Sequence, residues 1–342
     1  MDVRSARCQG RNCGRRGRSH GRSAPAPERS PVGRASIPPA GSLRHADGRA
    51  EHPGSGGGTN SVTLRRLGVI GTGLIGASIA GAARRSGARV QAFDLAPERL
   101  EIATARGMID EARASLEDAV EAVDAVVLAM PIAAIIHSLP AVDTLAAPGS
   151  LIVDVGSVKR PVLESMEGLP GARRTVGGHP IAGRETGGPA SADIDLFRDK
   201  PFVLVPTSRT SSTALAAARE LAEMVGARPL VTDAELHDEV LARTSHLPQL
   251  LSTALGLTLE PGDGRLSGSG LHDMTRLASS DPEVWRDILI ANDDRVSEAL
   301  RRCLAHLNRL ADAIERRAGE EIARILTEGK DRAAAERMES PA

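Results

Sequence analysis

Short apolar runs alternate with amphipathic stretches from residue 67 onward, and this alternation is the main guide to the fold. The apolar runs lie at Leu67–Ile70, Val90–Phe93, Ala125–Met130, Leu151–Val155 and Arg174–Val176. Helix-like stretches lie between most of them, among them Gly76–Arg85, Pro97–Ala105 and Leu116–Ala122. Because strands that alternate with helices form parallel sheets, the pattern predicts a Rossmann-type, doubly wound α/β fold. Two later runs, Phe202–Val205 and Arg228–Val231, are expected to extend the sheet.

Strand signals stop after residue 231, and only helical patterns follow. A capping box that begins at Thr232 predicts a long helix to about Leu257, with Pro248 inside it. A second capping box, at Ser280, predicts another helix to about Leu310. The apolar faces of these helices exceed what one small domain can bury. We therefore expect an all-α C-terminal domain that forms a homodimer.

The first sixty residues differ from the rest of the chain. They are rich in Arg, Gly, Ser and Pro and have almost no aliphatic clusters, which predicts a disordered tail over residues 1–61. A misassigned start or an idle tail is the preferred explanation. A basic arm that contacts nucleic acid and a transit peptide are the alternatives. The remaining chain is expected to divide into a nucleotide-binding domain over residues 62–231 and the helical domain over residues 232–330.

Composition narrows the class of protein. A net charge of -1 over 342 residues argues against a nucleic-acid partner, and no apolar run reaches the ~18 residues that a membrane span needs. Aromatic residues make up only 1% of the chain, so the core must be aliphatic. The three cysteines, Cys8, Cys13 and Cys303, have no spacing typical of disulfide frameworks or metal sites. A metal-free enzyme in the reducing cytoplasm is the simplest expectation.

The segment G-T-G-L-I-G follows the first apolar run and opens a helix. Gly71 permits a tight turn from strand to helix, Gly73 lets the backbone approach a pyrophosphate, and Gly76 lets the helix pack on the strand. The free N–H groups of the helix start, which includes Leu74 and Ile75, would face the phosphates. The motif predicts a dinucleotide site, whereas the alternative is a turn of structural use only.

Asp94 ends the second strand and indicates which dinucleotide is bound. A carboxylate about 20 residues after the glycines accepts hydrogen bonds from a ribose 2′-OH and repels a 2′-phosphate. NAD is therefore favoured over NADP, although the nearby Arg99 weakens this preference.

Three further residues follow the ends of predicted strands, where ligands of such sheets bind. Pro131 follows the third run and is expected to border the cofactor. His179 follows the fifth run and is the best candidate for a general base, because a neutral imidazole takes up protons near pH 7. Ser157 follows the fourth run and could bond a substrate hydroxyl. A loop histidine without a role and a helix cap are the respective alternatives.

The helical half adds three candidates. His237 and His246 are nine residues apart, so on a straight helix they point to opposite sides unless the break at Pro248 redirects the chain. His246, beside that break, is the better candidate, and His237 is expected at a surface or an interface. Arg276 could hold a carboxylate by two parallel hydrogen bonds, or it could be an ordinary solvated arginine.

Five segments together resemble the prephenate and arogenate dehydrogenase family. They are the glycine motif at Gly71, D-V-G-S-V-K from Asp154, G-G-H-P-I-A-G from Gly177, T-S-H-L-P from Thr244 and D-M-T-R-L-A-S-S-D-P-E-V-W from Asp273. The resemblance implies NAD-dependent oxidative decarboxylation of prephenate in tyrosine biosynthesis, with arogenate as the alternative substrate. It also implies that His179 is catalytic and that Ser157 orients the substrate hydroxyl and the nicotinamide. By the same resemblance, Arg276 holds a substrate carboxylate.

One residue departs from the family pattern. Many members read S-H-L-P-H, whereas this chain has Gln249 in the fifth position, where no cation can form. Prephenate carries a keto acid side chain and arogenate an amino acid one, and a neutral Gln249 could tolerate either, so the substrate choice stays open. Two other functions compete with this one. A hydroxyacid dehydrogenase or imine reductase would use a similar cofactor domain, but no lysine occurs between Lys200 and Lys330 to serve the former. A non-catalytic NAD-binding protein would tolerate the loss of His179.

Overall fold

The computed structural model describes residues 64–184 and 186–339. The expectation of a tail over residues 1–61 lies outside these residues, as do Cys8 and Cys13. The strands are β1 (Arg66–Ile70), β2 (Arg89–Phe93), β3 (Glu111–Ala112), β4 (Ala125–Leu128), β5 (Leu151–Asp154), β6 (Thr175–Pro180), β7 (Pro201–Pro206) and β8 (Arg228–Val231). They form one sheet in the order β3-β2-β1-β4-β5-β6-β7-β8.

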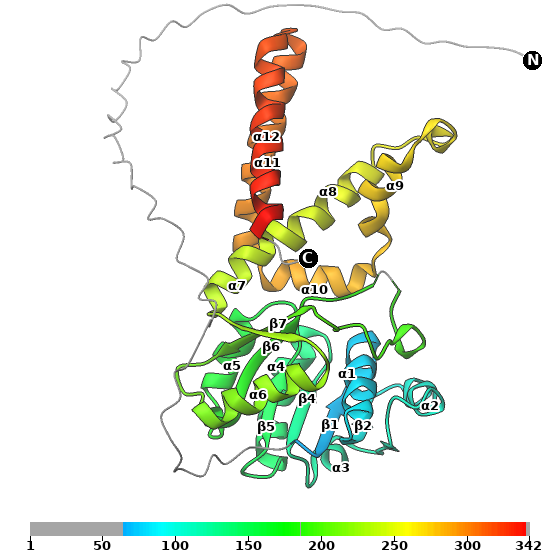
Figure 1. The fold of residues 1–342 in the computed structure, drawn as a ribbon, viewed down its shortest axis with the longest axis vertical. Helices are drawn as coiled ribbons and strands as arrows, with labels where there is room; N and C mark the ends of the chain where they lie inside the picture. Colours follow the sequence, from blue (N-terminus) through cyan, green and yellow to red (C-terminus); the bar gives the residue numbers. More distant parts are fainter. Residues whose placement is uncertain (1–63, 185, 340–342) are drawn as a thin grey trace, which may run out of the picture. The chain divides into compact units, whose positions relative to one another are not determined.

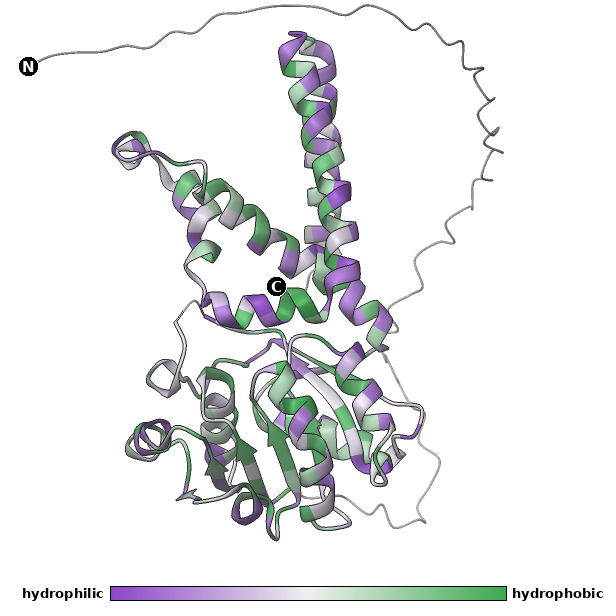
Figure 2. Ribbon diagram, turned by 180° about the vertical axis from the view of Figure 1, so that it is seen from behind, coloured by the Kyte–Doolittle hydropathy of each residue, from purple (hydrophilic) through white to green (hydrophobic). Residues whose placement is uncertain are grey.

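Helices cover both faces of this sheet (Figure 1). In the first half of the chain they are α1 (Leu74–Arg85), α2 (Pro97–Ala105), α3 (Leu116–Val120), α4 (Ile132–Leu145), α5 (Arg160–Glu167) and α6 (Ser212–Met224). One apolar cluster joins α1, α2 and α6 to the sheet, and a second joins α3, α4 and α5. The expected doubly wound arrangement is therefore confirmed, and the strands form its most continuously hydrophobic layer (Figure 2).

The sheet is parallel from β3 to β6, and its last two strands reverse direction. β6 pairs antiparallel with β7, which in turn pairs parallel with β8. β6 is also longer than the sequence predicts. Gly177 and Gly178 have no side chains to signal a strand, yet β6 continues through them to Pro180. His179 therefore lies within a strand and not in the loop after it, which corrects the prediction.

The second half of the described chain is helical. It contains α7 (Ala234–Leu241), α8 (Leu247–Gly256), α9 (Ser269–Thr275), α10 (Pro282–Ala291), α11 (Asp293–Glu315) and α12 (Gly319–Glu339). Single turns lie at η1 (Ala172–Arg174), η2 (Pro189–Ser191), η3 (Ala242–His246), η4 (Asp263–Leu266) and η5 (Arg276–Ser279). None of the helices in residues 64–184 and 186–339 is long and apolar enough to cross a membrane.

Both predicted capping boxes are displaced by one residue. Asp233 caps α7 through Leu236 N at 2.8 Å, and Asp281 caps α10 through Glu283 N at 2.8 Å. The predicted helix from Ser280 to Leu310 is also two helices, because the chain breaks at Asn292. The side chain of Asn292 is fully buried and bonded to neighbouring elements, which explains a break that no Gly or Pro announces.

Candidate active site

The glycine loop between β1 and α1 is shaped to admit a ligand. Gly71 has a φ of +93°, which favours glycine, and a Cβ on Gly76 would lie 1.9 Å from the carbonyl oxygen of Gly71. A Cβ on Gly73 would meet no atom within 4 Å. Within the described residues, no side chain caps the start of α1, where Leu74 and Ile75 lie, so its N–H groups are available to an anion.

Asp94 lies at the end of β2, beside this loop. One carboxylate oxygen accepts from Thr72 N at 2.7 Å and Thr72 Oγ1 at 3.1 Å, and the other accepts from Ala96 N at 3.0 Å. The guanidinium of Arg99 lies 3.9 Å from the same carboxylate oxygen that accepts from Thr72. The glycine loop and the acidic residue of the predicted nucleotide site are thus bound directly to each other. Pro131 precedes α4 at the same edge of the sheet and is exposed.

Ser157 lies half-buried between β5 and α5. The residue at the cap of α5 is Lys159, and the side chain that accepts from the N–H groups at the start of this helix belongs to Asp238, so Ser157 does not cap it. Because β5 and β6 are parallel, Ser157 follows the strand end that adjoins the end of β6. The position suits a residue that bonds a ligand at this edge.

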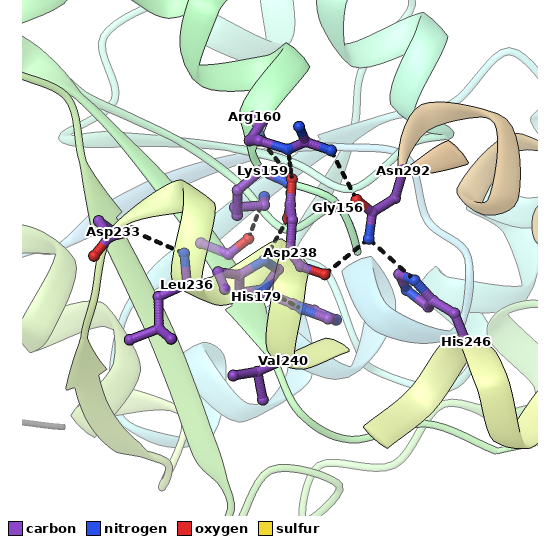
Figure 3. Close-up of polar contacts among 12 residues, drawn as sticks. Gly156, Lys159, Arg160, His179, Asp233, Leu236, Asp238, Val240, His246 and Asn292 are labelled. Carbon is purple, nitrogen blue, oxygen red and sulfur yellow. Dashed lines mark hydrogen bonds and ion pairs between the residues drawn. The ribbon is translucent and has the colours of Figure 1, made fainter. Parts of the chain in front are cut away.

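Three side chains lie in a line at the carboxyl end of β6, and Figure 3 labels the first and the last of them, His179 and Asp238. His179 Nδ1 lies 2.9 Å from Nε2 of His237, and His237 Nδ1 lies 2.7 Å from Oδ1 of Asp238. Both His237 and Asp238 have fully buried side chains. The expectation that His237 lies at a surface or an interface is therefore wrong, since it directly contacts the candidate base.

Asp238 also bonds the helical half of the chain to the sheet half. Its carboxylate accepts from Lys159 N at 2.8 Å and Arg160 N at 2.9 Å, which satisfies two N–H groups at the start of α5. The guanidinium of Arg160 lies 3.3 Å from the same carboxylate and continues to Asn292 and Asp294. Burial alone would raise the pKa of Asp238, but these hydrogen bonds and the one from His237 hold it below its usual range. Asp238 is therefore an anion at neutral pH.

The environment of His179 keeps its imidazole neutral. Burial, followed by the nearby His237, Lys159 and His246, lowers the pKa of His179 well below 6.5. With Asp238 ionised, His237 Nδ1–H donates to the carboxylate, which leaves His237 Nε2 as an acceptor. His179 Nδ1–H then donates to His237. Nε2 of His179 is left with its lone pair, as a general base requires.

His246 lies near the other two imidazoles because the helix is redirected. Residues Ala242–His246 form a π-turn, η3, which takes more residues per turn than an α-helix and rotates the faces that follow. The expected redirection therefore exists and begins before Pro248. His246 is 1% exposed, lies 3.3 Å from Asn292 and contacts Trp285 edge-on. Burial lowers its pKa to about 4.

Gln249 and Arg276, the other candidate substrate contacts, lie on neighbouring elements. Gln249 is 5% exposed on α8, and its Oε1 accepts no hydrogen bond from any residue in the described part of the chain. Arg276 is exposed on η5, which packs against α8. A buried amide oxygen without a partner is costly, so the carboxamide of Gln249 is suited to a polar ligand.

His237 and Asp238 adjoin the candidate base, although the sequence patterns did not predict them as site residues. Helical spacing alone places His237 away from His246. The signal in the sequence is the adjacent His-Asp pair itself, because a carboxylate beside an imidazole commonly fixes its tautomer.

Two family models match the chain. The one described as prephenate dehydrogenase, nucleotide-binding domain, matches residues 79–231, and the one described as prephenate dehydrogenase, dimerization domain, matches residues 233–328. A prephenate dehydrogenase of Bacillus subtilis is 31% identical over 77% of this chain and 74% of its own length. A cyclohexadienyl dehydrogenase of Zymomonas mobilis is 32% identical over 75% of this chain and 91% of its own length.

A solved structure has the same fold. The prephenate dehydrogenase of A. aeolicus, in complex with hydroxyphenyl propionate and NAD+, superposes with a TM-score of 0.73 at 32% identity. The match covers 81% of this chain and 99% of that one. Sequence families, curated relatives and fold agree with the arrangement of the glycine loop and the histidines. This chain belongs to the prephenate dehydrogenase family.

Proposed function

We propose that this enzyme oxidises and decarboxylates prephenate to 4-hydroxyphenylpyruvate with NAD, a step of tyrosine biosynthesis. The observation that carries the proposal is the line from His179 through His237 to Asp238, which ends on a neutral imidazole at the edge of the sheet that holds the glycine loop. The residues at that loop fit a dinucleotide, because Gly73 leaves space and the start of α1 is uncapped. Bound NAD supplies the acceptor for a hydride.

The proposed chemistry requires a base and alignment. Nε2 of His179 takes the proton of the ring hydroxyl as the carbinol C–H bond breaks and its electron pair leaves as hydride. The ring carboxylate then departs as CO₂, and the electrons of its C–C bond make the ring aromatic. The proton returns from His179 to the phenolic oxygen, so the residue ends as it began. Ser157 orients the hydroxyl, and Asp94 binds the adenosine ribose of NAD and disfavours NADP.

We place the substrate's anionic groups toward the helical half. Arg276 is proposed to hold a carboxylate, and His246 and Gln249 are proposed to line the side-chain pocket. A guanidinium pairs with a carboxylate in two parallel hydrogen bonds, which suits a dianionic substrate. Gln249 contributes a neutral carboxamide with a buried, unpartnered oxygen.

Turnover assays test this function directly. The purified full chain is supplied with prephenate or arogenate, each with NAD or NADP, and reduced nicotinamide is followed by absorbance. The expected order places prephenate with NAD first. His179→Asn should lower kcat by about a hundredfold or more, the scale of a lost general base, and leave KM for prephenate nearly unchanged. Turnover of neither substrate, or an unaffected His179→Asn variant, would contradict the proposal.

We further propose that the active species is a cytoplasmic homodimer built on the helical domain. Leu304, Leu307 and Ile314 of α11 are exposed at a spacing that puts them on one helix face. Leu326 of α12 is also exposed, and α12 packs on α11 (Figure 1). Sedimentation of the full chain should give a dimer, and Leu307→Glu should shift it toward monomer. A wild-type monomer would refute this assembly.

The domain division is likewise a proposal. We place the boundary between residues 231 and 232, with residues 62–231 forming the nucleotide-binding domain and 232–330 the helical one. We propose that residues 1–61 are dispensable. A chain that starts near Ser61 should keep full activity with prephenate and NAD, and a large loss would show that the preceding segment takes part.

A further inference from the structure

A lysine and an aspartate are buried behind the strand that carries His179. The side chains of Lys159 and Asp154 are 0% exposed and form an ion pair. Burial lowers the pKa of Lys159, and Asp154 opposes that effect. Burying two charges removes their hydration, so such a pair contributes little to stability compared with apolar residues of the same size. Its presence therefore calls for another role.

The Asp154–Lys159 pair forms the hydrogen bonds to β6 that a neighbouring strand would otherwise form. β5 pairs with β6 only at Ile152↔Thr175 and Val153↔Val176, and β5 then ends while β6 continues. Gly178 lies beyond this register. Its N–H donates to Asp154 Oδ1 at 3.3 Å, and its carbonyl accepts from Lys159 Nζ at 2.6 Å. Side chains thus satisfy both backbone groups of the residue that precedes His179.

The two glycines before His179 make room for this arrangement. A Cβ on Gly177 would lie 2.5 Å from Leu163 Cδ1 and 3.3 Å from Lys159 Cδ. A Cβ on Gly178 would lie 2.6 Å from the carbonyl oxygen of Asp154. The stem of Lys159 therefore runs close beneath the strand, and its ammonium reaches the backbone beside the base.

Lys159 is also one of several charged or titratable groups around His179. The others are His237 and His246, with Asp238 beyond His237 and Asp154 paired to the lysine itself. Of these, the ammonium of Lys159 is ion-paired with Asp154 and donates to the carbonyl of Gly178. Its positive charge opposes protonation of the nearby imidazole.

We propose that the Asp154–Lys159 pair is a positioning device for His179, which fixes the end of β6 and keeps the imidazole unprotonated. The inference rests on the proposed function only in naming His179 as the base. The pair contacts neither substrate nor cofactor, because it lies wholly inside the protein. Its effect should therefore be visible in the free enzyme as well as in turnover.

Two substitutions at Lys159 separate charge from hydrogen bonding. Lys159→Met removes both, whereas Lys159→Gln removes the charge and keeps an N–H group for the carbonyl of Gly178. Both variants also leave the carboxylate of Asp154 without its ion-pair partner. The titration of His179, followed by NMR of ¹⁵N-histidine-labelled protein without substrate, should move upward by about one pH unit in both. The acid limb of kcat/KM should move with it.

The two variants should differ in turnover. Lys159→Met should lose about tenfold in kcat, because a small displacement of a catalytic group is costly, and Lys159→Gln should lose less. Arg174→Met is the matched control. Arg174 pairs with Asp143 at the other end of β6, with side chains 14% and 6% exposed, so its loss should lower Tm but leave the His179 titration in place.

The outcomes distinguish this proposal from the proposed function. An unshifted His179 titration in both Lys159 variants would overturn it, as would an equal shift in Arg174→Met. If Lys159→Met does not fold, Lys159→Gln alone decides. If the wild type turns over no prephenate but the titration shifts as expected, the pair keeps its role and the proposed reaction fails.

Discussion

At the residue scale, Asp238 sets the tautomer of His179 through the intervening His237. Asp238 is anionic, so its neighbour His237 must present a lone pair to His179, and His179 must in turn direct its own lone pair outward. The candidate base thus needs no charged partner of its own. A carboxylate in direct contact would raise its affinity for protons, whereas an imidazole between them transmits orientation and less charge.

Replacing His237 should therefore affect turnover more than binding. In His237→Phe the acceptor for His179 Nδ1–H is lost, so the imidazole can adopt the wrong tautomer, and kcat should fall by about 10- to 100-fold. His237→Gln keeps an acceptor oxygen and should recover part of that loss. KM for prephenate should change little in both. A loss confined to KM would assign His237 to substrate binding instead.

Replacing Arg276 should affect substrate binding more than turnover. If its guanidinium holds a substrate carboxylate, Arg276→Ala should raise KM for prephenate by about tenfold or more, on the scale of a charge-assisted hydrogen bond, with a smaller effect on kcat. Arg276→Lys, which keeps the charge but not the planar fork, should lie between. Steady-state kinetics at saturating NAD provides the measurement. Unchanged KM in Arg276→Ala would remove this residue from the site.

At the scale of elements, the turn from β1 to α1 combines two glycines with different duties. Gly76 is needed by the protein itself, because a Cβ there would overlap the carbonyl of Gly71. Gly73 has open space around it and is needed only when a ligand approaches. The two glycines belong to one sequence motif, but Gly76 is required for packing and Gly73 for ligand binding.

Paired alanine substitutions test this separation. Gly76→Ala should lower Tm and weaken NAD binding together, because the helix must move away from the strand. Gly73→Ala should keep the wild-type Tm and still weaken NAD binding by about tenfold or more, since the added methyl occupies the approach of the pyrophosphate. Thermal unfolding and calorimetric titration with NAD measure both quantities. A stable Gly73→Ala protein with normal NAD affinity would contradict the placement of the cofactor.

Some strands and turns could be predicted from the sequence and others could not. Apolar periodicity and the glycine motif predicted the parallel strands β1, β2, β4 and β5, because buried parallel strands need continuous apolar runs. The same criterion missed β3, which is only two residues long, and shortened β6 at its glycines. The π-turn η3 has no signature in residue type, and it packs against α11, a contact that no local pattern encodes.

The sequence predicted only those residues of the candidate site whose position depends on the sheet alone. Residues that follow strands, such as Ser157, are placed by the sheet alone, and His179 was placed at the correct edge although within the strand. His237 and Asp238 required knowledge of how the helical half docks on the sheet. Their contacts join positions 58 and 79 residues apart, which no local pattern encodes.

At the scale of the whole molecule, neutral buried histidines make stability depend on pH. The pKa of His246 is about 4, against 6.5 in the unfolded chain. Between pH 6.5 and pH 4, His246 is therefore protonated in the unfolded chain but neutral in the folded protein. The free energy of unfolding is at its full value above pH 6.5 and should fall by about 3 kcal/mol for this group as the pH drops to 4. His179 acts in the same direction.

Urea unfolding at pH 7 and pH 4.5 measures this loss. His246→Asn should be less stable than wild type at pH 7, because it loses packing against Trp285, but its stability should decline less between the two pH values. An equal decline in wild type and variant would show that other groups govern the acid sensitivity.

The edge-on contact between His246 and Trp285 gives the protein an internal optical probe. The ring centroids lie 6.0 Å apart, and the chain contains one tryptophan and no tyrosine. Its near-ultraviolet emission therefore originates almost wholly from one indole beside the cluster of histidines. A protonated imidazole quenches indole emission, so intensity against pH would trace the ionisation of a single side chain without label or substitution.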